Sequence, residues 1–500
     1  MDQPRKNGLR RLYKPIILII LLIGLGLRSY QYFMGRSLWH DEAHLALNFV
    51  DHGFAGLTKP LDNYQSAPIF FLFAIEMFTR LFGFGELALR VAPFLLSIIA
   101  LPLFFWLVRD LTRNATAALI ALFIFCINIS LVYYSSELKP YTVDVSVFVI
   151  MAYLAVSEHE FVRKRRTILL TIVGCLAVLF SNASTVVLTC VFSYLVWQAA
   201  SKNNSVNKLP WKNLAIIAVC WAVVFVANYL KFIYQHPYAD GMKQIWSHTF
   251  CPTPLFTTEF NDFIRIRSEE MFFSEMLYFN TGMFLPFPVV FLMLTGIGYF
   301  IYRGQYPALL LTVLPVLLHL CLSMEKLYPF HLRFILYLVP PIIILLSIGM
   351  GVIADVLTKF VHRSVAIIFV VFFLFQAAEP SVKQFPKWEI RIKPSVMYID
   401  KHYPETKLLI TTPLTMYQFY NKTGLVRNNN YDRIEWSLSP EQFLNLEVVK
   451  AQKSNFIMLH SSKGGDNTDP IIDELKKRGL IERQFFNNNF AVSEIRPVGQ

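Results

Sequence analysis

Charged residues and paired cysteine motifs are both scarce in this sequence. Only 16% of the 500 residues are Asp, Glu, Lys or Arg, whereas a soluble domain carries roughly 25%. The low charge argues against a soluble enzyme, and the 55% of hydrophobic residues excludes a disordered chain. The six cysteines form no C-x-x-C pair, so the sequence indicates neither a disulfide framework nor a zinc knuckle.

Signature motifs of several enzyme classes are also missing. The chain has no Walker A, protein-kinase or G-x-S-x-G sequence. Its net charge of +12 comes without a basic–aromatic RNA-binding pattern, so we expect no nucleic-acid partner. Cytoplasmic loops of membrane proteins are rich in Lys and Arg, which explains the same charge. The composition therefore predicts an all-α polytopic membrane protein.

Apolar runs long enough to cross a hydrocarbon core of about 30 Å recur over the first 380 residues. We expect about eleven transmembrane helices, two of them short spans within 167–200 that are separated near Asn182 and Ser184. The other nine lie near residues 16–34, 87–108, 115–134, 141–158, 213–233, 284–302, 306–324, 333–354 and 364–379.

Lys and Arg are concentrated in alternate loops, which places the N-terminus in the cytoplasm and the C-terminus outside. Residues 35–86, 234–283 and 381–500 then lie outside the plasma (inner) membrane. We expect a transmembrane domain over 1–380 and a small extracytoplasmic α/β domain over 381–500. In the latter, 408–412 and 456–460 read as strands, 440–452 and 470–478 as helices, and 461–470 as a loop.

The first outer loop contains the most informative motif, SLWHDEAH at 37–44. It begins an amphipathic helix whose polar face carries His40, His44 and Asn48, and such a helix lies along a membrane surface. Asp41 and Glu42 point about 100° apart and should do different jobs. One interpretation makes Asp41 a reacting carboxylate, and the other makes it a helix-start carboxylate near the positive end of the dipole. The apolar run 69–82 is too short to span and predicts a second interfacial helix.

His40 and His44 have the H-x-x-x-H spacing of zinc proteases. Asp41 stands where the glutamate of H-E-x-x-H is required, so a zinc protease is not indicated. No cofactor follows from the sequence, although carboxylate and imidazole groups leave a divalent metal ion open.

Two further groups of polar residues lie at outer ends of predicted spans. The first contains Glu137, Lys139, Tyr141 and Asp144. Glu137 and Lys139 are either site residues or a weak exposed pair. Asp144 enters a membrane helix, where an ionisable group is costly and commonly functional, although a structural role stays open.

The second group is Arg333 in YPFHLR at 328–333, and Arg28 lies near the outer end of the first span. Each is either a site residue or an arginine that extends to the membrane interface. The glycines of G-I-G at 296–298 and G-M-G at 349–351 are expected to pack helices rather than to bind phosphate.

Several of these motifs resemble the GT-C type of bacterial membrane glycosyltransferase, relatives of the protein O-mannosyltransferases and of the lipid A aminoarabinose transferase. Arg28 with SLWHDEA at 37–43 is similar to the family's "R…slW-x-DEA" opening, and APIFF at 67–71 to its "P-P-hydrophobic" helix. FGFGELALR at 82–90, SELKPY at 136–141 and YPFHLR at 328–333 resemble later motifs, with Lys139 in place of the usual arginine. The resemblance covers about residues 15–345.

The resemblance implies transfer of a hexosyl or pentosyl group from a polyprenyl-phosphate donor to an acceptor hydroxyl of a lipid, glycan or protein outside the cytoplasm. It implies that Asp41 is the catalytic base with Glu42 beside it. It also implies cations near the donor phosphate, for which Lys139, Arg333 and Arg28 are candidates. His40, His44, Glu137, Tyr141 and Asp144 are candidate supporting residues.

Elementary chemistry agrees with that role. A carboxylate on an interfacial helix can accept the proton of an acceptor hydroxyl. Attack opposite the departing lipid phosphate would invert the anomeric centre, and nearby cations would stabilise the leaving charge. The competing hypothesis is a transporter or flippase of lipid-linked sugars. Transporters tend to be built of paired repeats with matching broken helices, and no such symmetry is visible here.

Overall fold

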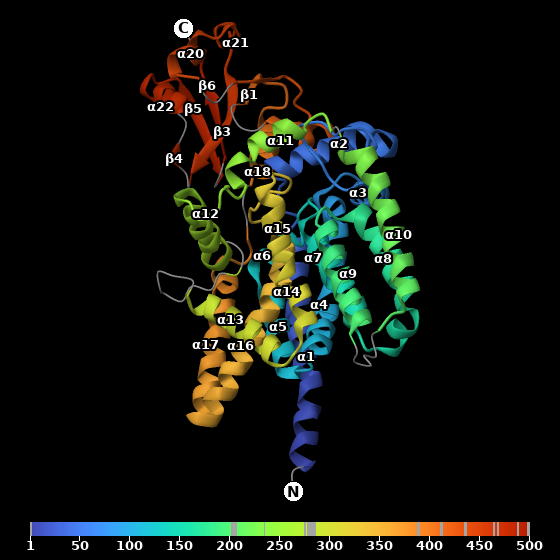
Figure 1. Cartoon of the computed structure of the whole chain (residues 1–500). Helices are drawn as coiled ribbons and strands as arrows, with labels where there is room; N and C mark the ends of the chain where they lie inside the picture. The colour runs from blue at the N-terminus through green and yellow to red at the C-terminus, as the bar shows by residue number, and fades with distance from the viewer. Residues whose placement is uncertain are drawn as a thin grey trace. The chain divides into compact units, whose positions relative to one another are not determined.

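The fold was analysed in a computed structural model of the chain. It describes residues 3–201, 208–234, 236–274, 277, 287–387, 391–410, 414–434, 438–463, 466–467, 470–487 and 490–497. The chain forms two compact units (Figure 1). We call residues 1–33, 66–75 and 90–387 the transmembrane unit, and residues 34–65, 76–89 and 388–500 the C-terminal unit. The predicted boundary after residue 380 differs from this division, because residues 34–65 and 76–89, most of the loop after α1, group with the C-terminal residues.

The transmembrane unit is helical. Helices α3 and α4 belong to it only in part. The helices are α1 (Gln3–Phe33), α3 (Ile69–Phe82), α4 (Glu86–Thr112), α5 (Ala115–Ile127), α6 (Ile129–Tyr134), α7 (Tyr141–Val156), α8 (Glu160–Phe180), α9 (Ser184–Ala200), α10 (Trp211–Asn228), α11 (Ala239–Ile245), α12 (Thr258–Glu269), α13 (Phe287–Tyr302), α14 (Tyr306–Thr312), α15 (Leu314–Met324), α16 (Val339–Phe360) and α17 (Arg363–Gln384). Short π or 3-10 turns are η1 (Tyr229–Ile233), η2 (Ser247–Thr249), η3 (Glu270–Ser274) and η4 (Leu336–Leu338).

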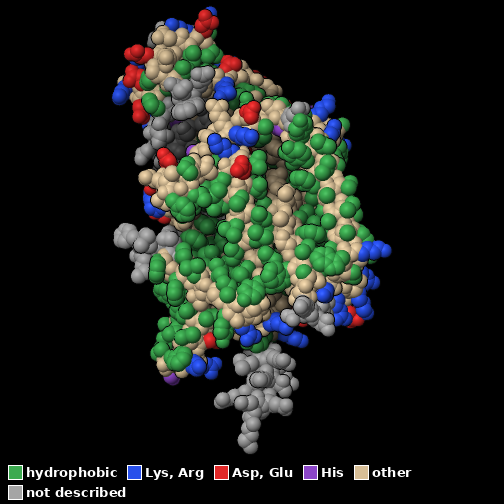
Figure 2. All heavy atoms as spheres, viewed as in Figure 1, with side chains coloured by type: hydrophobic (Ala, Val, Ile, Leu, Met, Phe, Trp, Pro, Cys, Tyr) green, Lys and Arg blue, Asp and Glu red, His purple; other side chains and the backbone are tan. Residues whose placement is uncertain are grey.

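These helices form a multi-pass membrane protein. Within the described residues, five helices are long and apolar enough to cross a membrane, or up to seven if each of two bent pairs is one span. Three shorter apolar helices, α5, α9 and α13, add to them. Exposed apolar side chains such as Ile168, Val219 and Val223 cover α8 and α10, and Figure 2 shows apolar side chains over the helices in view. Each predicted span has a helical counterpart, but the count of eleven stays a prediction.

Several predicted spans are broken by local chemistry. The two helices expected within 167–200 are α8 and α9, which separate at residues 181–183 as Asn182 and Ser184 suggested. The expectation of two short helices is wrong for α8, which begins at Glu160 and has 21 residues. The span expected at 115–134 divides at Asn128, whose side-chain oxygen accepts the Leu131 N–H at 2.9 Å and starts α6. The span expected at 306–324 bends by 44° between α14 and α15.

Glycine lets α13 and α16 approach closely. A Cβ atom on Gly296 would lie 2.3 Å from the Leu345 carbonyl oxygen, and one on Gly349 would lie 2.0 Å from the Leu292 carbonyl oxygen. Both distances are far below van der Waals contact, so these two glycines pack helices, as the sequence predicted. Gly298 and Gly351 have nothing within 4 Å of an added Cβ.

Gly349→Ala is therefore expected to destabilise the protein by about 3 kcal/mol, the upper part of the usual range for overpacking. The new methyl group meets backbone, which cannot move aside as a side chain can. Gly351→Ala, two residues along the same helix, is the matched control and should leave the thermal unfolding midpoint in detergent nearly unchanged. Equal midpoints for both variants would contradict the close packing of α13 against α16.

The C-terminal unit combines helices with a mixed sheet. Its helices are α2 (His40–Gly56), α18 (Lys393–His402), α19 (Leu414–Lys422), α20 (Pro440–Asn445), α21 (Glu447–Lys450) and α22 (Pro470–Lys477). Its strands are β1 (Leu408–Ile410), β2 (Tyr431–Arg433), β3 (Phe456–Lys463), β4 (Asp466–Asn467), β5 (Ile481–Asn487) and β6 (Phe490–Ile495). The strand order is β2-β1-β3-β6-β5, with β4 beside β3. β1 is parallel to β2 and β3, whereas β6 is antiparallel to β3 and β5.

The predicted α/β character is confirmed, with differences in detail. Ser439 caps α20 by accepting the Gln442 N–H at 3.2 Å. The single helix expected over 440–452 is wrong, because the chain breaks at Leu446 into α20 and α21. The loop expected from 461 is also wrong at its start, since β3 continues to Lys463 and pairs with β4. The proposed cap Asp469 lies outside the described residues.

Candidate active site

Asp41 lies in the first turn of α2, within the C-terminal unit. The carboxylate is half-buried, and its Oδ1 accepts a hydrogen bond from the Gln65 side-chain amide at 3.4 Å. An acidic group at this position is stabilised by the positive end of the helix dipole. As a carboxylate, Asp41 can in principle accept a proton from a hydroxyl group.

The loop that carries Gln65 has an unusual backbone. Asn63 and Tyr64 are consecutive non-glycine residues with φ of 59° and 53°. Asn tolerates this left-handed region, but Tyr does not, and such strain costs about 1–3 kcal/mol. Asn48 of α2 holds the loop, because its Oδ1 accepts the Asp62 N–H at 2.8 Å. Asn48 is buried, and its bond to Asp62 fixes the loop three residues before Gln65.

Glu42 has a different environment from Asp41, as predicted for neighbours on a helix. It is fully buried, and its Oε2 accepts the Trp39 N–H at 3.4 Å at the start of α2. The His40 and His44 rings lie 4.1 Å apart on the same helix. In the described part of the chain, no group of three or more His, Cys, Asp or Glu side chains is arranged to hold a metal ion.

The polar segment between α6 and α7, in the transmembrane unit, is buried. Glu137 is 0% exposed and Lys139 is 6% exposed. The alternative of a weak exposed pair at these two positions is therefore wrong. Burial shields both groups from water, and a cation shielded from water acts more strongly on a charged group than one in solvent does. The segment is therefore a candidate for binding a charged substrate.

Asp144 is engaged by the break between α8 and α9. Its Oδ1 accepts the Ser181 hydroxyl at 2.6 Å and the Ala183 N–H at 3.4 Å. The carboxylate thus caps the backbone where α9 begins, which is a structural function. This contact favours the structural alternative that the sequence left open for Asp144.

Arg333 lies in an aromatic cluster of the transmembrane unit. Its guanidinium carbon lies 4.9 Å from the ring centroid of Trp246 and 5.7 Å from those of Tyr141 and Phe334. Arginine stacks on aromatic faces in this way while it keeps its outer nitrogens for hydrogen bonding. Because Tyr141 begins α7 just after Lys139, the cluster joins Arg333 to the buried segment 136–141.

Arg28 is 1% exposed; its guanidinium carbon lies 5.7 Å from the Phe125 ring centroid, and it also bonds to backbone oxygens. It donates to the carbonyl groups of Gly24, Cys126 and Phe125 at 3.2, 2.8 and 3.1 Å. These bonds tie α1 to the end of α5, where the helix breaks before Asn128. Phosphate binding by Arg28 stays a prediction, and its present contacts have a structural function.

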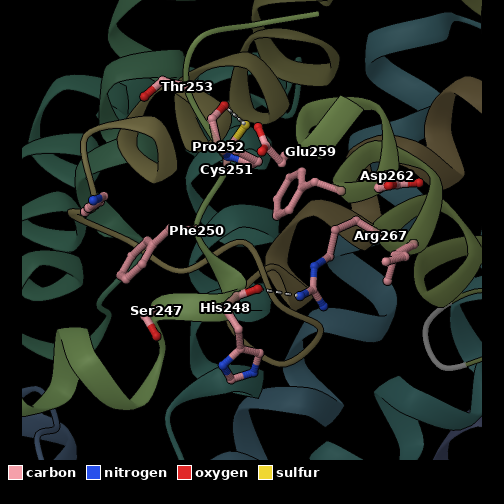
Figure 3. Close-up of a pocket in the computed structure, with 12 residues that line it drawn as sticks. Ser247, His248, Phe250, Cys251, Pro252, Thr253, Glu259, Asp262 and Arg267 are labelled. Atoms are coloured by element: carbon pink, nitrogen blue, oxygen red, sulfur yellow. Dashed lines mark hydrogen bonds between the residues drawn. The ribbon is translucent and has the colours of Figure 1, made fainter. Parts of the chain in front are cut away.

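The transmembrane unit also contains a hollow of about 460 Å³ (Figure 3). Its lining residues are Ser247, His248, Phe250, Cys251, Pro252, Thr253, Glu259, Asp262, Phe263, Ile266, Arg267 and Lys326. Arg267 donates to the His248 carbonyl oxygen at 3.2 Å and pairs with Glu270, so it ties α12 to the 247–249 turn. Trp246 connects the hollow with Arg333, because its ring also stacks on that of His248.

His331 lies beside the same cluster and is expected to make stability sensitive to acid. Burial, with the positive charges of Arg267, Arg333 and His248 nearby, lowers the pKa of His331 from 6.5 to about 4. The unfolded chain therefore binds more protons than the folded one between pH about 6.5 and about 4. Stability should fall as the pH drops through this window. Unfolding midpoints across it should fall less for His331→Gln, and equal slopes would contradict the prediction.

Three residues, one in the C-terminal unit and two in the transmembrane unit, were not singled out from the sequence. Gln65 and Trp246 contact predicted site residues, and the Lys387 ammonium lies 5.2 Å from the Tyr133 ring centroid. Gln31 anchors Lys387 by bonding to both its backbone N–H and its carbonyl oxygen. Asn63, a residue type that tolerates a left-handed backbone, is a weak local signal for the turn before Gln65, but nothing local indicated Trp246 or Lys387.

Comparison with known proteins gives one family match over part of the chain and several similar solved structures. Residues 66–228 match the family model described as dolichyl-phosphate-mannose-protein mannosyltransferase. The structure of ArnT from Cupriavidus metallidurans bound to undecaprenyl phosphate is similar to this chain, with a TM-score of 0.51 and 12% sequence identity. The similarity covers 97% of this chain and 98% of that structure.

The apo oligosaccharyltransferase of Archaeoglobus fulgidus is also similar, with a TM-score of 0.50 and 13% identity over 82% of this chain. The chain has a GT-C fold. It spans 64% of the length of that oligosaccharyltransferase. No curated protein sequence matches it. The GT-C fold, which the motifs at 37–44 and 136–141 predicted, is confirmed.

Proposed function

We propose that this chain is a membrane glycosyltransferase that moves a sugar from a polyprenyl-phosphate donor to an acceptor hydroxyl. The observation that carries the proposal is Asp41, a half-buried carboxylate at the start of α2 that a strained loop holds through Gln65. The GT-C fold and the undecaprenyl phosphate bound to the similar ArnT support a lipid-phosphate donor.

In the proposed reaction, Asp41 accepts the proton of the acceptor hydroxyl as its oxygen attacks the anomeric carbon of the sugar. The bond from that carbon to the lipid phosphate breaks, and the phosphate leaves with the electron pair from the opposite face. The configuration therefore inverts. Lys139 and Arg333 stabilise the phosphate charge, and no protonation of the leaving group is needed because phosphate is already a good leaving group.

The proposal is tested with purified full-length protein and a polyprenyl-phosphate sugar radiolabelled in the sugar. Cell-envelope glycans and glycolipids of cells with and without the protein identify the acceptor to add. Label should pass to that acceptor and leave free polyprenyl phosphate. Movement of intact labelled donor across vesicles without any transfer would instead support the transporter hypothesis.

A further inference from the structure

The helices α18 and α19 of the C-terminal sequence contact the chain that leads into α2. The residues involved, Ser37, Leu38, Glu86, Lys393 and Tyr420, all belong to the C-terminal unit. The Tyr420 hydroxyl accepts the Leu38 N–H at 3.0 Å and donates to Glu86 Oε1 at 3.1 Å. One hydroxyl group thus joins the residue three positions before Asp41 to the start of α4.

The same contact is reinforced on both sides. Lys393 of α18 pairs with both Glu86 oxygens, at 2.9 and 3.1 Å, and its backbone N–H donates to the Ser37 hydroxyl at 3.1 Å. Tyr420 is 2% exposed and Glu86 is 9% exposed. Because these groups are shielded from water, each hydrogen bond constrains geometry more strongly than a surface bond would.

A second tie lies at the far end of α2. Lys422 of α19 pairs with both oxygens of Asp51, at 2.8 and 2.7 Å. This pair is partly exposed and contributes little by itself. Together, the Tyr420–Leu38 hydrogen bond and the Lys422–Asp51 ion pair connect α19 to the start of α2 and to a later turn of the same helix.

We infer that Tyr420 is a positioning residue for Asp41. Helices α18 and α19 then contribute to activity by fixing the start of α2, the helix that carries the base. The inference rests on the proposed function for its kinetic consequence. Its structural consequence, protection of the Leu38 amide, does not depend on any activity. Misplacing a reacting group by about 1 Å can lower turnover roughly 100-fold.

The test is Tyr420→Phe in the full-length protein, which keeps the buried ring and removes only the bridging hydroxyl. We expect kcat to fall by roughly 10- to 100-fold while KM for the donor stays within about twofold. Hydrogen exchange of a peptide spanning Leu38 and Asp41 should accelerate. The matched control is Tyr417→Phe, one turn earlier in α19, whose hydroxyl donates to the Asn428 carbonyl oxygen at 2.8 Å and not to a residue of α2.

Tyr417→Phe should leave both the exchange of that peptide and kcat close to the wild-type values. Unchanged exchange and kcat in Tyr420→Phe, or equal changes in both variants, would overturn the inference and reduce Tyr420 to ordinary packing. If the wild-type protein transfers no sugar but Tyr420→Phe still accelerates exchange at Leu38, the proposed function fails and the positioning of α2 stands.

Discussion

Asp41→Asn is expected to lower turnover by roughly 100- to 10,000-fold, the range for loss of a general base. Asparagine has nearly the same size and can still accept a hydrogen bond from Gln65, but it cannot take a proton at neutral pH. The fall should appear in kcat, measured as transfer from a radiolabelled polyprenyl-phosphate sugar by purified protein. Donor binding and expression should persist, because a helix-start carboxylate contributes only about 1 kcal/mol.

Two variants on the same helix control for loss of charge and for loss of the cap. Asp51→Asn removes a carboxylate that pairs with Lys422 near the other end of α2. It should lower the free energy of unfolding by less than about 1 kcal/mol. Glu42→Gln keeps an oxygen for the Trp39 N–H, so its effect should be milder than that of Asp41→Asn. Near-normal transfer by folded Asp41→Asn would remove the general base from the mechanism.

Lys139→Gln is expected to lower kcat/KM for the donor by roughly 100-fold, comparable with loss of one oxyanion donor. The lysine is 6% exposed, and a buried cation acts on a departing phosphate more strongly than one in water. KM for the acceptor should change little, because the proposed role of this cation is toward the donor phosphate and not toward the acceptor hydroxyl. Steady-state rates with donor and acceptor varied separately measure the difference.

Lys139→Arg separates charge from folding at this position. It keeps the positive charge and supplies a guanidinium fork that suits phosphate, so donor use should be retained. Arg333→Gln should weaken donor use in the same direction and also loosen the cluster with Trp246 and Tyr141, which the unfolding midpoint reports. Wild-type donor kinetics in both Gln variants would return Lys139 and Arg333 to structural roles.

Some residues were interpreted correctly from local sequence because the deciding forces act within a few residues. The capping of α20 by Ser439 depends on neighbouring groups, and the polar residues Asn182 and Ser184 marked the break at 181–183 in the local sequence. Hydrophobic runs also predicted where helices form, since each must bury its backbone bonds in lipid. Strands β5 and β6 were not predicted from the sequence, because the sheet in which a strand pairs determines its conformation more than its own composition does.

By itself, the sequence determined that this is a polytopic helical membrane protein with a C-terminal α/β domain, and it singled out Asp41, Lys139 and Arg333. Only the tertiary structure decided their environments. Burial of Glu137 and Lys139, stacking of Arg333 on Trp246, and the contact of Tyr420 with Leu38 join residues that are distant in the chain. Such contacts arise from long-range packing, which leaves no periodic or local signal along a single sequence.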